Sequence, residues 1–483
     1  MSCADLTALL PLLVTAGAAV VVMLGIACFR SHLLTLVLTL AGLGLAILSL
    51  VPASTAAPKL ATPLLTIDHY ALFYQGLILA AAFVTTMLSY GYLKRLKERP
   101  EEFYLLLLLA TLGSAVLVAS SHFASFFLGL EVLSVSLYAL IAYPRARLIG
   151  IEAAIKYLVV AGVSSAFLLF GMALIYADTG TMQFSELTYR ASGGSHDFTV
   201  LMLAGTGMIL VGIGFKLALV PFHLWTPDVY EGAPAPVTAF IATVSKGAVF
   251  ALLLRYFTLV PFHPYDSLVL VFVLLAAVSM LVGNLLALRQ NDVKRILAYS
   301  SIAHLGYLMV AFLASGPLAA TAVTYYLVAY FITTLGAFGA VTVLSTGQRD
   351  AGPMEDFRGL AWRRPWLAGM LTAMLFSLAG IPLTAGFVGK FYVLTAGVGA
   401  ELWGLVLVLA VASAIGLFYY LRIVVAIFSS PAAEAEGERP AARVSLTFMG
   451  GVALAGLTLL LVWLGVYPAP MIAFIDAAVA GLF

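Results

Sequence analysis

Five ionisable residues interrupt long apolar stretches of the chain: Glu131, Lys216, Lys246, His304 and Lys390. Carboxyl, amino and imidazole groups all bind and release protons, and removal from water changes how readily each does so. The chain contains no Walker sequence, no CxxC pair and no HExxH pattern. These residue types therefore indicate proton transfer rather than nucleotide, redox or metal chemistry, and we expect no cofactor on this chain.

The composition indicates which solvent surrounds these residues. Of 483 residues, 63% are hydrophobic and 10% are charged, and the mean hydropathy is +1.09. A surface in contact with water would not be this apolar. Runs of about 20 apolar residues recur along the chain, and each is long enough to cross a membrane as a helix. We therefore predict an all-α polytopic membrane protein, with residues 1–483 as a single transmembrane domain.

We expect about fourteen transmembrane spans, with ends accurate to a few residues. They cover residues 6–29, 31–51, 69–93, 103–120, 122–143, 150–176, 200–231, 234–260, 266–288, 294–313, 316–345, 366–398, 402–428 and 444–467.

The basic residues predict which side of the membrane each connection occupies. Most of the 24 lysines and arginines lie in connections that follow odd-numbered spans, such as 94–99, 145–147 and 349–364. The even-numbered connections hold only Lys59 and Arg190. Because basic residues favour the cytoplasmic side, the odd-numbered connections are predicted to be cytoplasmic and both termini periplasmic.

Glu131, Lys216, Lys246 and His304 each fall near the middle of a predicted span, so they share one depth in the membrane. An isolated charge there costs about 2.5 to 3.5 kcal/mol on insertion scales, so such residues usually face protein or water and belong to an ion pathway. The alternative is a buried salt bridge between Glu131 and one lysine that only fixes helix packing. One carboxylate cannot neutralise three lysines and a histidine, which favours the pathway.

Small polar residues recur at helical spacing beside these ionisable residues, which together with Lys390 are here called the row. They are Ser134 and Tyr138 after Glu131, Thr243 before Lys246, and Ser300, Ser301 and Tyr307 around His304. These faces could carry hydrogen-bonded waters. The alternative is that the hydroxyl groups bond their own helix backbone or ease close helix contacts.

Two long spans contain a proline near a lysine. Pro221 follows Lys216 in the seventh span, and Pro382 precedes Lys390 in the twelfth. Proline removes a backbone donor and clashes with the preceding turn, so each span is predicted to consist of two half-helices that meet near mid-membrane. A harmless kink is the alternative, and it is less plausible for two helices that each carry a lysine.

The broken spans are five apart, which suggests a repeated unit of five helices. Because five is odd, consecutive copies of such a unit enter the membrane from opposite sides. We predict inverted repeats at 103–260 (spans 4–8) and 266–428 (spans 9–13), followed by a last transmembrane helix and a short C-terminal segment at 444–483. Glu131 and His304 then occupy matching spans.

Three further basic residues lie within or at the ends of spans. Lys156 follows Glu152 by four residues, which suits an ion pair along one helix. Arg255 and Arg422 lie near span ends, so we expect their charged groups to reach water.

Four segments of the sequence resemble a known family. They are FKLALVPFHLWTPDVYEGAPAPVTAF, SKGAVF, YSSIAHLGYL and SLAGIPLTAGFVGKFYV, around Lys216, Lys246, His304 and Lys390. They are similar to the antiporter-like membrane subunits of bacterial proton-pumping NADH:quinone oxidoreductase, respiratory complex I. The resemblance covers essentially the whole chain, and the VYEGAP form and Lys390 are more similar to subunit N than to its sister subunits L and M.

The resemblance implies a role for each residue of the row. Glu131 would pair with Lys216, Lys246 would be the central proton relay, His304 would lie between the central and exit lysines, and Lys390 would lead toward the periplasmic exit.

The resemblance also implies a setting for the chain. It would lie in a bacterial inner membrane, in contact with lipid and with other membrane subunits of complex I, including antiporter-like neighbours, and it would bind no nucleic acid. NADH, FMN, iron-sulfur clusters and quinone would be bound by other subunits.

Other classes stay open at this point. A stand-alone or Mrp-type cation/proton antiporter would use the same fold, as would the equivalent subunit of a related hydrogenase or of a photosynthetic NDH complex. A purely structural scaffold is less plausible, because it would not need three lysines within the membrane.

Overall fold

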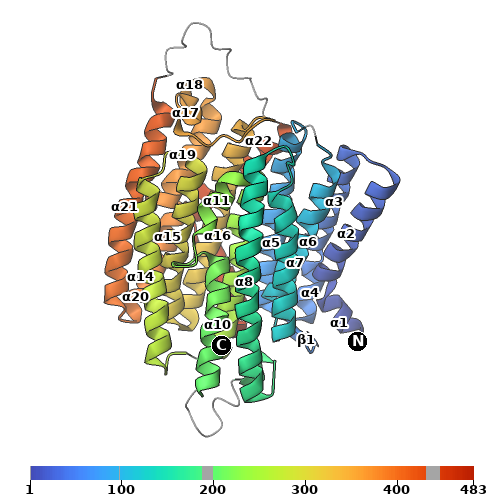
Figure 1. Cartoon of the computed structure of the whole chain (residues 1–483), viewed down its shortest axis with the longest axis vertical. Coiled ribbons are helices and arrows are strands. Elements are labelled where there is room, and N and C mark those ends of the chain that lie inside the picture. The colour runs from blue at the N-terminus through green and yellow to red at the C-terminus, as the bar shows by residue number, and fades with distance from the viewer. Residues whose placement is uncertain (1, 97, 188–198, 261, 431–446, 483) are drawn as a thin grey trace.

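The computed structural model describes residues 2–96, 98–187, 199–260, 262–430 and 447–482. Long helices run side by side through the molecule, and both termini lie at one end of the bundle, here called the terminal end (Figure 1). The short helices α17 (Met354–Phe357) and α18 (Leu360–Arg363) lie at the other end, here called the loop end.

The N-terminal part packs its helices against the two repeats that were predicted. Its elements are α1 (Cys3–Ala8), α2 (Leu10–Cys28), α3 (His32–Leu48), α4 (Leu50–Ala56), β1 (Lys59–Thr62), β2 (Leu65–Ile67) and α5 (His69–Leu93). The antiparallel hairpin β1–β2 was not expected from the sequence. Pro58 and Pro63 flank its first strand and prevent a helix from continuing through this connection.

The middle of the chain contains the first predicted repeat. Its elements are α6 (Glu101–Val118), α7 (Phe123–Ile141), α8 (Leu148–Thr179), α10 (Val200–Leu217), α11 (Trp225–Gly232), α12 (Ala235–Phe240), the π-helical turn η1 (Ile241–Ser245) and α13 (Lys246–Leu259).

The C-terminal part contains the second predicted repeat and a final helical segment. Its remaining elements are α14 (Asp266–Leu288), α15 (Val293–Ala314), α16 (Gly316–Leu344), α19 (Pro365–Ala379), α20 (Ala385–Gly399), α21 (Trp403–Phe428), α22 (Phe448–Val466), α23 (Ala469–Val479) and the 3₁₀ turn η2 (Ala480–Leu482). The short segment expected after the last span thus includes a helix, α23.

The number of membrane-crossing helices agrees with the sequence analysis. Within the described residues, 13 helical stretches are long and apolar enough to cross a membrane. The broken pair α19–α20, whose halves are shorter, provides the remaining expected span.

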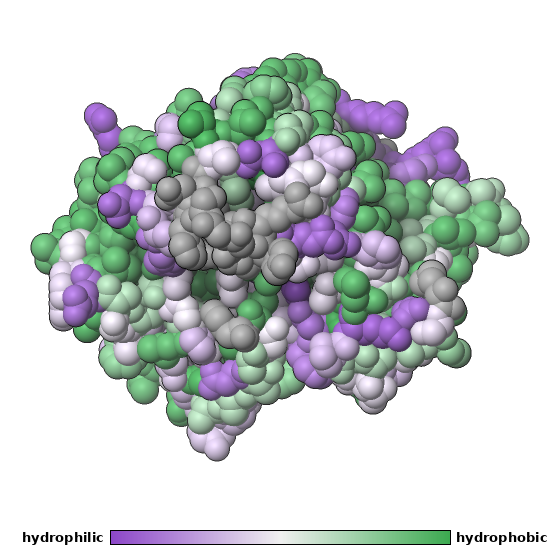
Figure 2. Space-filling view, turned by 90° about the horizontal axis from the view of Figure 1, so that it is seen from below, coloured by the Kyte–Doolittle hydropathy of each residue, from purple (hydrophilic) through white to green (hydrophobic). Residues whose placement is uncertain are grey.

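The helices that carry the central residues of the row lie in the middle of the bundle. The apolar windows of α12–α13, α15 and α16 are 100%, 94% and 94% buried, whereas those of α8, α21 and α22 are 33% buried. The outer helices therefore present apolar faces to the surroundings. At the terminal end, hydrophilic residues gather around the middle of the face and hydrophobic residues make up most of its margin (Figure 2).

Glycines allow close helix crossings in both halves. A Cβ at Gly113 of α6 would lie 2.8 Å from the Gly129 carbonyl oxygen of α7, and a Cβ at Gly283 of α14 would lie 2.8 Å from the Ala303 nitrogen of α15. Gly205, part of the GTG sequence in α10, packs in the same way against the Gly171 carbonyl of α8. Small residues at such crossings let backbones approach closely.

Candidate functional site

The seventh span is broken, as predicted, and the break begins before the proline. Helix α10 ends at Leu217, and Ala218 adopts a left-handed backbone with φ of 60°. The Leu219 N–H donates to the Gly214 carbonyl at 2.9 Å, a pattern that often closes a helix. The Trp225 indole then donates to the Phe215 carbonyl at 3.0 Å, so the break leaves this acceptor satisfied.

Lys216 lies in the last turn of α10, directly before the break, and is 2% exposed. Its ammonium donates to Ser134 Oγ at 2.6 Å and to the Tyr157 hydroxyl at 3.0 Å. It also lies 5.1 Å from the centre of the Tyr157 ring. The lysine therefore contacts helices α7 and α8 through uncharged groups.

Glu131 is half-buried on α7 and does not form the ion pair with Lys216 that was expected. Its carboxylate accepts from Ser165 Oγ of α8 at 2.6 Å. Among the described residues, the salt bridges do not include Glu131, and Ser134, one turn further along α7, occupies the position beside Lys216. The Lys216 ammonium thus contacts Ser134, one turn from Glu131 on α7, rather than the Glu131 carboxylate.

Lys246 is the first residue of α13 and follows the π-helical turn η1. It is 1% exposed, and its ammonium donates to Ser301 Oγ of α15 at 2.7 Å. The hydroxyl of Tyr330 donates to the same Ser301 oxygen at 2.7 Å, and that of Tyr230 lies 3.3 Å from it. A π-helical turn often marks a functional position, because it re-aims the residues around it.

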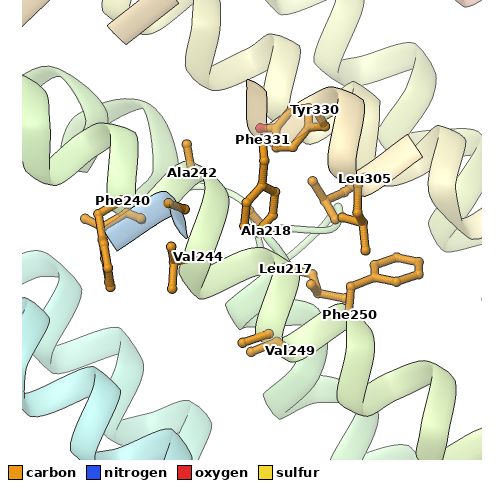
Figure 3. Packing of buried hydrophobic residues seen from close by; sticks show 14 of the residues in the cluster. Leu217, Ala218, Phe240, Ala242, Val244, Val249, Phe250, Leu305, Tyr330 and Phe331 are labelled. Atoms are coloured by element: carbon orange, nitrogen blue, oxygen red, sulfur yellow. The ribbon is translucent and has the colours of Figure 1, made fainter. Parts of the chain in front are cut away.

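Apolar side chains from neighbouring helices pack against α12 and α13. Figure 3 shows Leu217 and Ala218 from the end of α10, Leu305 from α15 and Phe331 from α16 gathered around α12 and α13. A Cβ at Gly247, next to Lys246, would lie 2.4 Å from the Phe331 ring. The helix that carries Lys246 is therefore packed directly against α16.

His304 lies on α15 one turn after Ser301 and is 4% exposed. Its Nδ1 lies 2.6 Å from the Tyr326 hydroxyl and its Nε2 lies 3.0 Å from the Tyr420 hydroxyl. Both ring nitrogens thus have a hydroxyl partner, so a proton can be held on either side of the ring.

Lys390 lies on α20, after the break in the twelfth span. That break includes Gly380 and Leu383, which have φ of 85° and 69°. The Lys390 ammonium donates to the Ala379 carbonyl and to Ser413 Oγ, both at 2.8 Å. A cavity of about 410 Å³ lies beside it, between α20 and α21. The freed carbonyl of the first half-helix is therefore a partner of the lysine.

Aromatic side chains connect the members of the row. The Trp225 ring lies 4.8 Å from that of Tyr157, the partner of Lys216, and α11 also carries Tyr230, which lies beside the Ser301 partner of Lys246. The Tyr330 and Tyr307 rings lie 5.5 Å and 5.4 Å from the His304 ring, and Lys390 Nζ lies 5.3 Å from the Tyr307 centroid. The structure therefore brings the four buried residues of the row into one polar and aromatic layer, with Glu131 at its edge.

Most of these tyrosines were not predicted from the sequence. Residues that contact the row or its Ser301 partner and were not anticipated are Tyr157, Ser165, Tyr230, Tyr326, Tyr330, Ser413 and Tyr420. A usable signal was present at Tyr326 and Tyr330, which lie four residues apart inside an apolar span and so share one helix face.

The small polar residues that were expected fall into both alternatives. Ser134 and Ser301 accept from lysines of the row, and Ser300 bonds to Tyr420. Thr243, in contrast, donates to the carbonyl of Ala239 on its own helix at 2.7 Å.

Arg255 does not reach water, which corrects the expectation for this residue. It is 3% exposed and forms a two-point ion pair with Asp68, the N-cap of α5, at 2.7 Å for both contacts. Lys156 pairs with Glu152 at 2.8 Å as expected, and it also pairs with Asp228 of α11 at 2.8 Å. A carboxylate within reach explains why a buried arginine need not extend to the surface.

The fold and the row of buried lysines define an antiporter-like membrane subunit. Within the described residues, no group of three or more His, Cys, Asp or Glu side chains could hold a metal ion. Residues 120–416 match the family described as NADH:quinone oxidoreductase/Mrp antiporter, TM.

Curated relatives are similar along nearly the whole chain. The chain is 50% identical to NADH-quinone oxidoreductase subunit N of Ectopseudomonas mendocina, covering 98% of this chain and 96% of the relative. It is 54% identical to the subunit N of Nitrosospira multiformis, covering 99% and 97%. The chain belongs to the subunit N family of NADH-quinone oxidoreductase.

Solved structures share the fold. A chain of respiratory complex I from Thermus thermophilus is 34% identical, with a TM-score of 0.82 over 97% of this chain and 99% of that one. A chain of the Mrp complex from Dietzia is 22% identical, with a TM-score of 0.83 over 100% of this chain and 98% of that one. At that identity the second similarity establishes the fold alone.

Proposed function

We propose that the chain is a proton-translocating membrane subunit of NADH:quinone oxidoreductase that moves protons through Lys216, Lys246, His304 and Lys390. The observation that carries the proposal is the continuous layer of buried lysine, histidine, serine and tyrosine groups between the two broken helices. Each lysine has only uncharged partners, so it can lose its proton without leaving a buried carboxylate behind.

Glu131 is proposed to act on this row from its edge. It lies on the same helix as Ser134, the partner of Lys216, but is itself bonded to Ser165. A carboxylate that approaches an ammonium stabilises its charged form, and one that withdraws removes this stabilisation. A small movement of α7 relative to α10 would therefore change how firmly Lys216 holds its proton.

The test is proton pumping in membranes that carry Lys246→Ala. The expected result is loss of pumping with a normal amount of assembled complex, because Ser301, which also accepts from Tyr330, loses its contact with the ammonium of Lys246. Pumping at the original rate in Lys246→Ala would contradict the proposed path, and the same result in Lys390→Ala would contradict it at the exit lysine.

We also propose an orientation, with both termini periplasmic in a bacterial inner membrane. The support is that both termini lie at the terminal end, whereas the basic connection 349–364 lies at the loop end (Figure 1). NADH oxidation and quinone reduction are assigned to other subunits of the complex, and the outer apolar helices provide faces for antiporter-like neighbours and lipid.

We propose the two inverted repeats on the basis of matching contacts. In the first repeat α6 packs on α7 and α13, and α8 packs on the broken pair α10–α11; in the second, α14 packs on α15 and α21, and α16 packs on the broken pair α19–α20. Each repeat also has a glycine crossing between its first two helices. The broken pairs run in opposite directions between the terminal end and the loop end (Figure 1).

A further inference from the structure

A buried carboxylate at the loop end joins four parts of the chain. Asp350, in the connection between α16 and α17, accepts from the Tyr92 hydroxyl at 2.7 Å and from Arg147 at 2.7 Å through one oxygen. Its other oxygen accepts from Lys294 at 2.9 Å and from the Ala235 N–H at 2.8 Å. Both carboxylate oxygens therefore have two donors each.

Lys294 uses its remaining hydrogen-bond donors on the turn between α11 and α12. It is 1% exposed and donates to the carbonyls of Glu231 at 2.9 Å and Ala233 at 2.7 Å, as well as to Asp350. Helix α12 begins after Pro234 and has no side-chain cap from its own segment. Lys294 thus binds the end of α11 and Asp350 binds the start of α12.

Helix α15 then holds the α12–α13 segment at two points. Lys294 lies in its first turn, and Ser301, the acceptor of Lys246, lies seven residues later on the same face. Two helical turns, about 10 Å, separate the two attachments. The first attachment therefore sets the position from which Lys246 reaches Ser301.

We propose that Lys294 and Asp350 are positioning residues for proton transfer, which hold the α11–α12 turn so that Lys246 stays in contact with Ser301. This inference rests on the proposed function of Lys246. Neither residue touches the row itself, so their effect must pass through the placement of α12 and α13.

The test is a double-mutant comparison of proton pumping per assembled complex. Lys294→Met should lower pumping about tenfold, because displacement of a reacting group by a fraction of an ångström to 1 Å slows transfer steeply. Lys294→Arg, which keeps the charge and donors, should retain most pumping. In a Ser301→Ala background, Lys294→Met should add less than about a twofold loss, because the contact it positions is already absent.

Asp350→Asn provides a second variant, since it removes the charge and keeps the size of the side chain. It should lower pumping in the same way, because one of its two oxygens becomes a donor that faces other donors. The matched control is Asp5→Asn in α1, whose ion pair with Lys59 lies at the terminal end of the molecule. The control should pump normally.

The outcomes separate this inference from the proposed function. Normal pumping by Lys246→Ala would overturn the proposed function, and the positioning role with it. Loss of pumping in Lys246→Ala with normal pumping in Lys294→Met would overturn the positioning role alone. Additive losses in Lys294→Met with Ser301→Ala would mean that Lys294 acts independently of this contact, and would also overturn the positioning role. Failure of both Lys294→Met and Asp350→Asn to assemble would overturn it too, because the cluster would then be a requirement for folding.

Discussion

Glu131 and Lys216 bond to different partners, so a substitution at either residue removes a different contact. Because Glu131 and Lys216 are not an ion pair here, replacing both should not restore what either loss removes. We expect Glu131→Gln and Lys216→Met each to reduce pumping in assembled complex, and the double variant Glu131→Leu with Lys216→Met to stay impaired. The measurement is proton pumping and NADH:quinone activity in membranes. Near-normal pumping by the double variant would show a purely structural pair.

The buried pair of Arg255 and Asp68 makes a prediction about stability. Arg255→Met leaves a buried carboxylate without its partner and should cost about 3 to 5 kcal/mol, whereas Arg255→Met with Asp68→Asn should recover much of this loss. Asparagine can also still cap α5. Thermal unfolding of detergent-solubilised protein measures both. Arg30→Ala is the control, because the Arg30 and Glu102 side chains of that pair are 47% and 40% exposed.

The ion pairs of Asp350 should make the folded protein less stable in acid. Burial alone would raise its pKa, but Lys294 and Arg147 hold the pKa below the usual value. Its stabilisation is therefore present above the pKa of an unfolded aspartate, near 4, and is lost as the pH falls through the lower folded value. Asp350→Asn should be less stable at neutral pH and should lack this acid-side loss. Unfolding temperatures between about pH 3 and 7 measure the difference.

At the scale of the element, the contact of α13 with α16 makes a further prediction. Gly247→Ala would place a methyl group where the Phe331 ring now lies and should move Lys246 away from Ser301, lowering pumping several-fold. Helix propensity alone would favour alanine, so any loss comes from packing. Gly207→Ala on α10 is the control, because no atom lies within 4 Å of its added Cβ. Equal pumping by both variants would contradict this account.

Much of the element architecture could be predicted from the sequence, because apolar length and proline are strong local signals. The breaks near Pro221 and Pro382 were predicted correctly, yet the first begins at Ala218, whose left-handed backbone depends on tertiary packing. The π-helical turn η1 has no comparable local signal. The hairpin β1–β2 is too short to show a period in the sequence.

The site was predictable where a charge stands out against apolar neighbours, and less so where the residue suits both a core and a proton path. Lys216, Lys246 and Lys390 could be identified because burying a charge is costly. The separation of Glu131 from Lys216 depends on how α7 packs on α8 and α10, which no local pattern encodes. Tyr157 and Tyr420 carry no such signal, because a tyrosine within an apolar span is also typical of a protein core.

For the molecule as a whole, the sequence could not distinguish inner from outer helices. Helix α16 lies in the centre and α8 at the surface, yet both are long and apolar enough to cross a membrane, because lipid is as apolar as a protein core. Only the positions of the ionisable residues pointed to the interior.

The orientation of the whole molecule can be tested with its own two cysteines. Both are exposed: Cys3 lies at the terminal end, and Cys28 lies at the other end of α2 (Figure 1). With periplasmic termini, a membrane-impermeant maleimide added to intact cells should label Cys3, and Cys28 only after permeabilisation. The single variants Cys3→Ser and Cys28→Ser assign the signal, and Gln348→Cys provides a second position at the loop end. Labelling of Cys28 in intact cells would reverse the orientation.

The tryptophan at the first helix break gives the protein an internal optical reporter. Trp225 is 4% exposed and its ring lies 4.8 Å from that of Tyr157, the partner of Lys216. The other four tryptophans, at 362, 366, 403 and 463, are 41% to 83% exposed. Replacing those four by phenylalanine leaves one indole, whose emission should be at short wavelength because its surroundings are apolar. Since its N–H bonds the carbonyl freed by the break, a change in the geometry of the break during turnover should alter this fluorescence, so motion next to Lys216 becomes visible in real time.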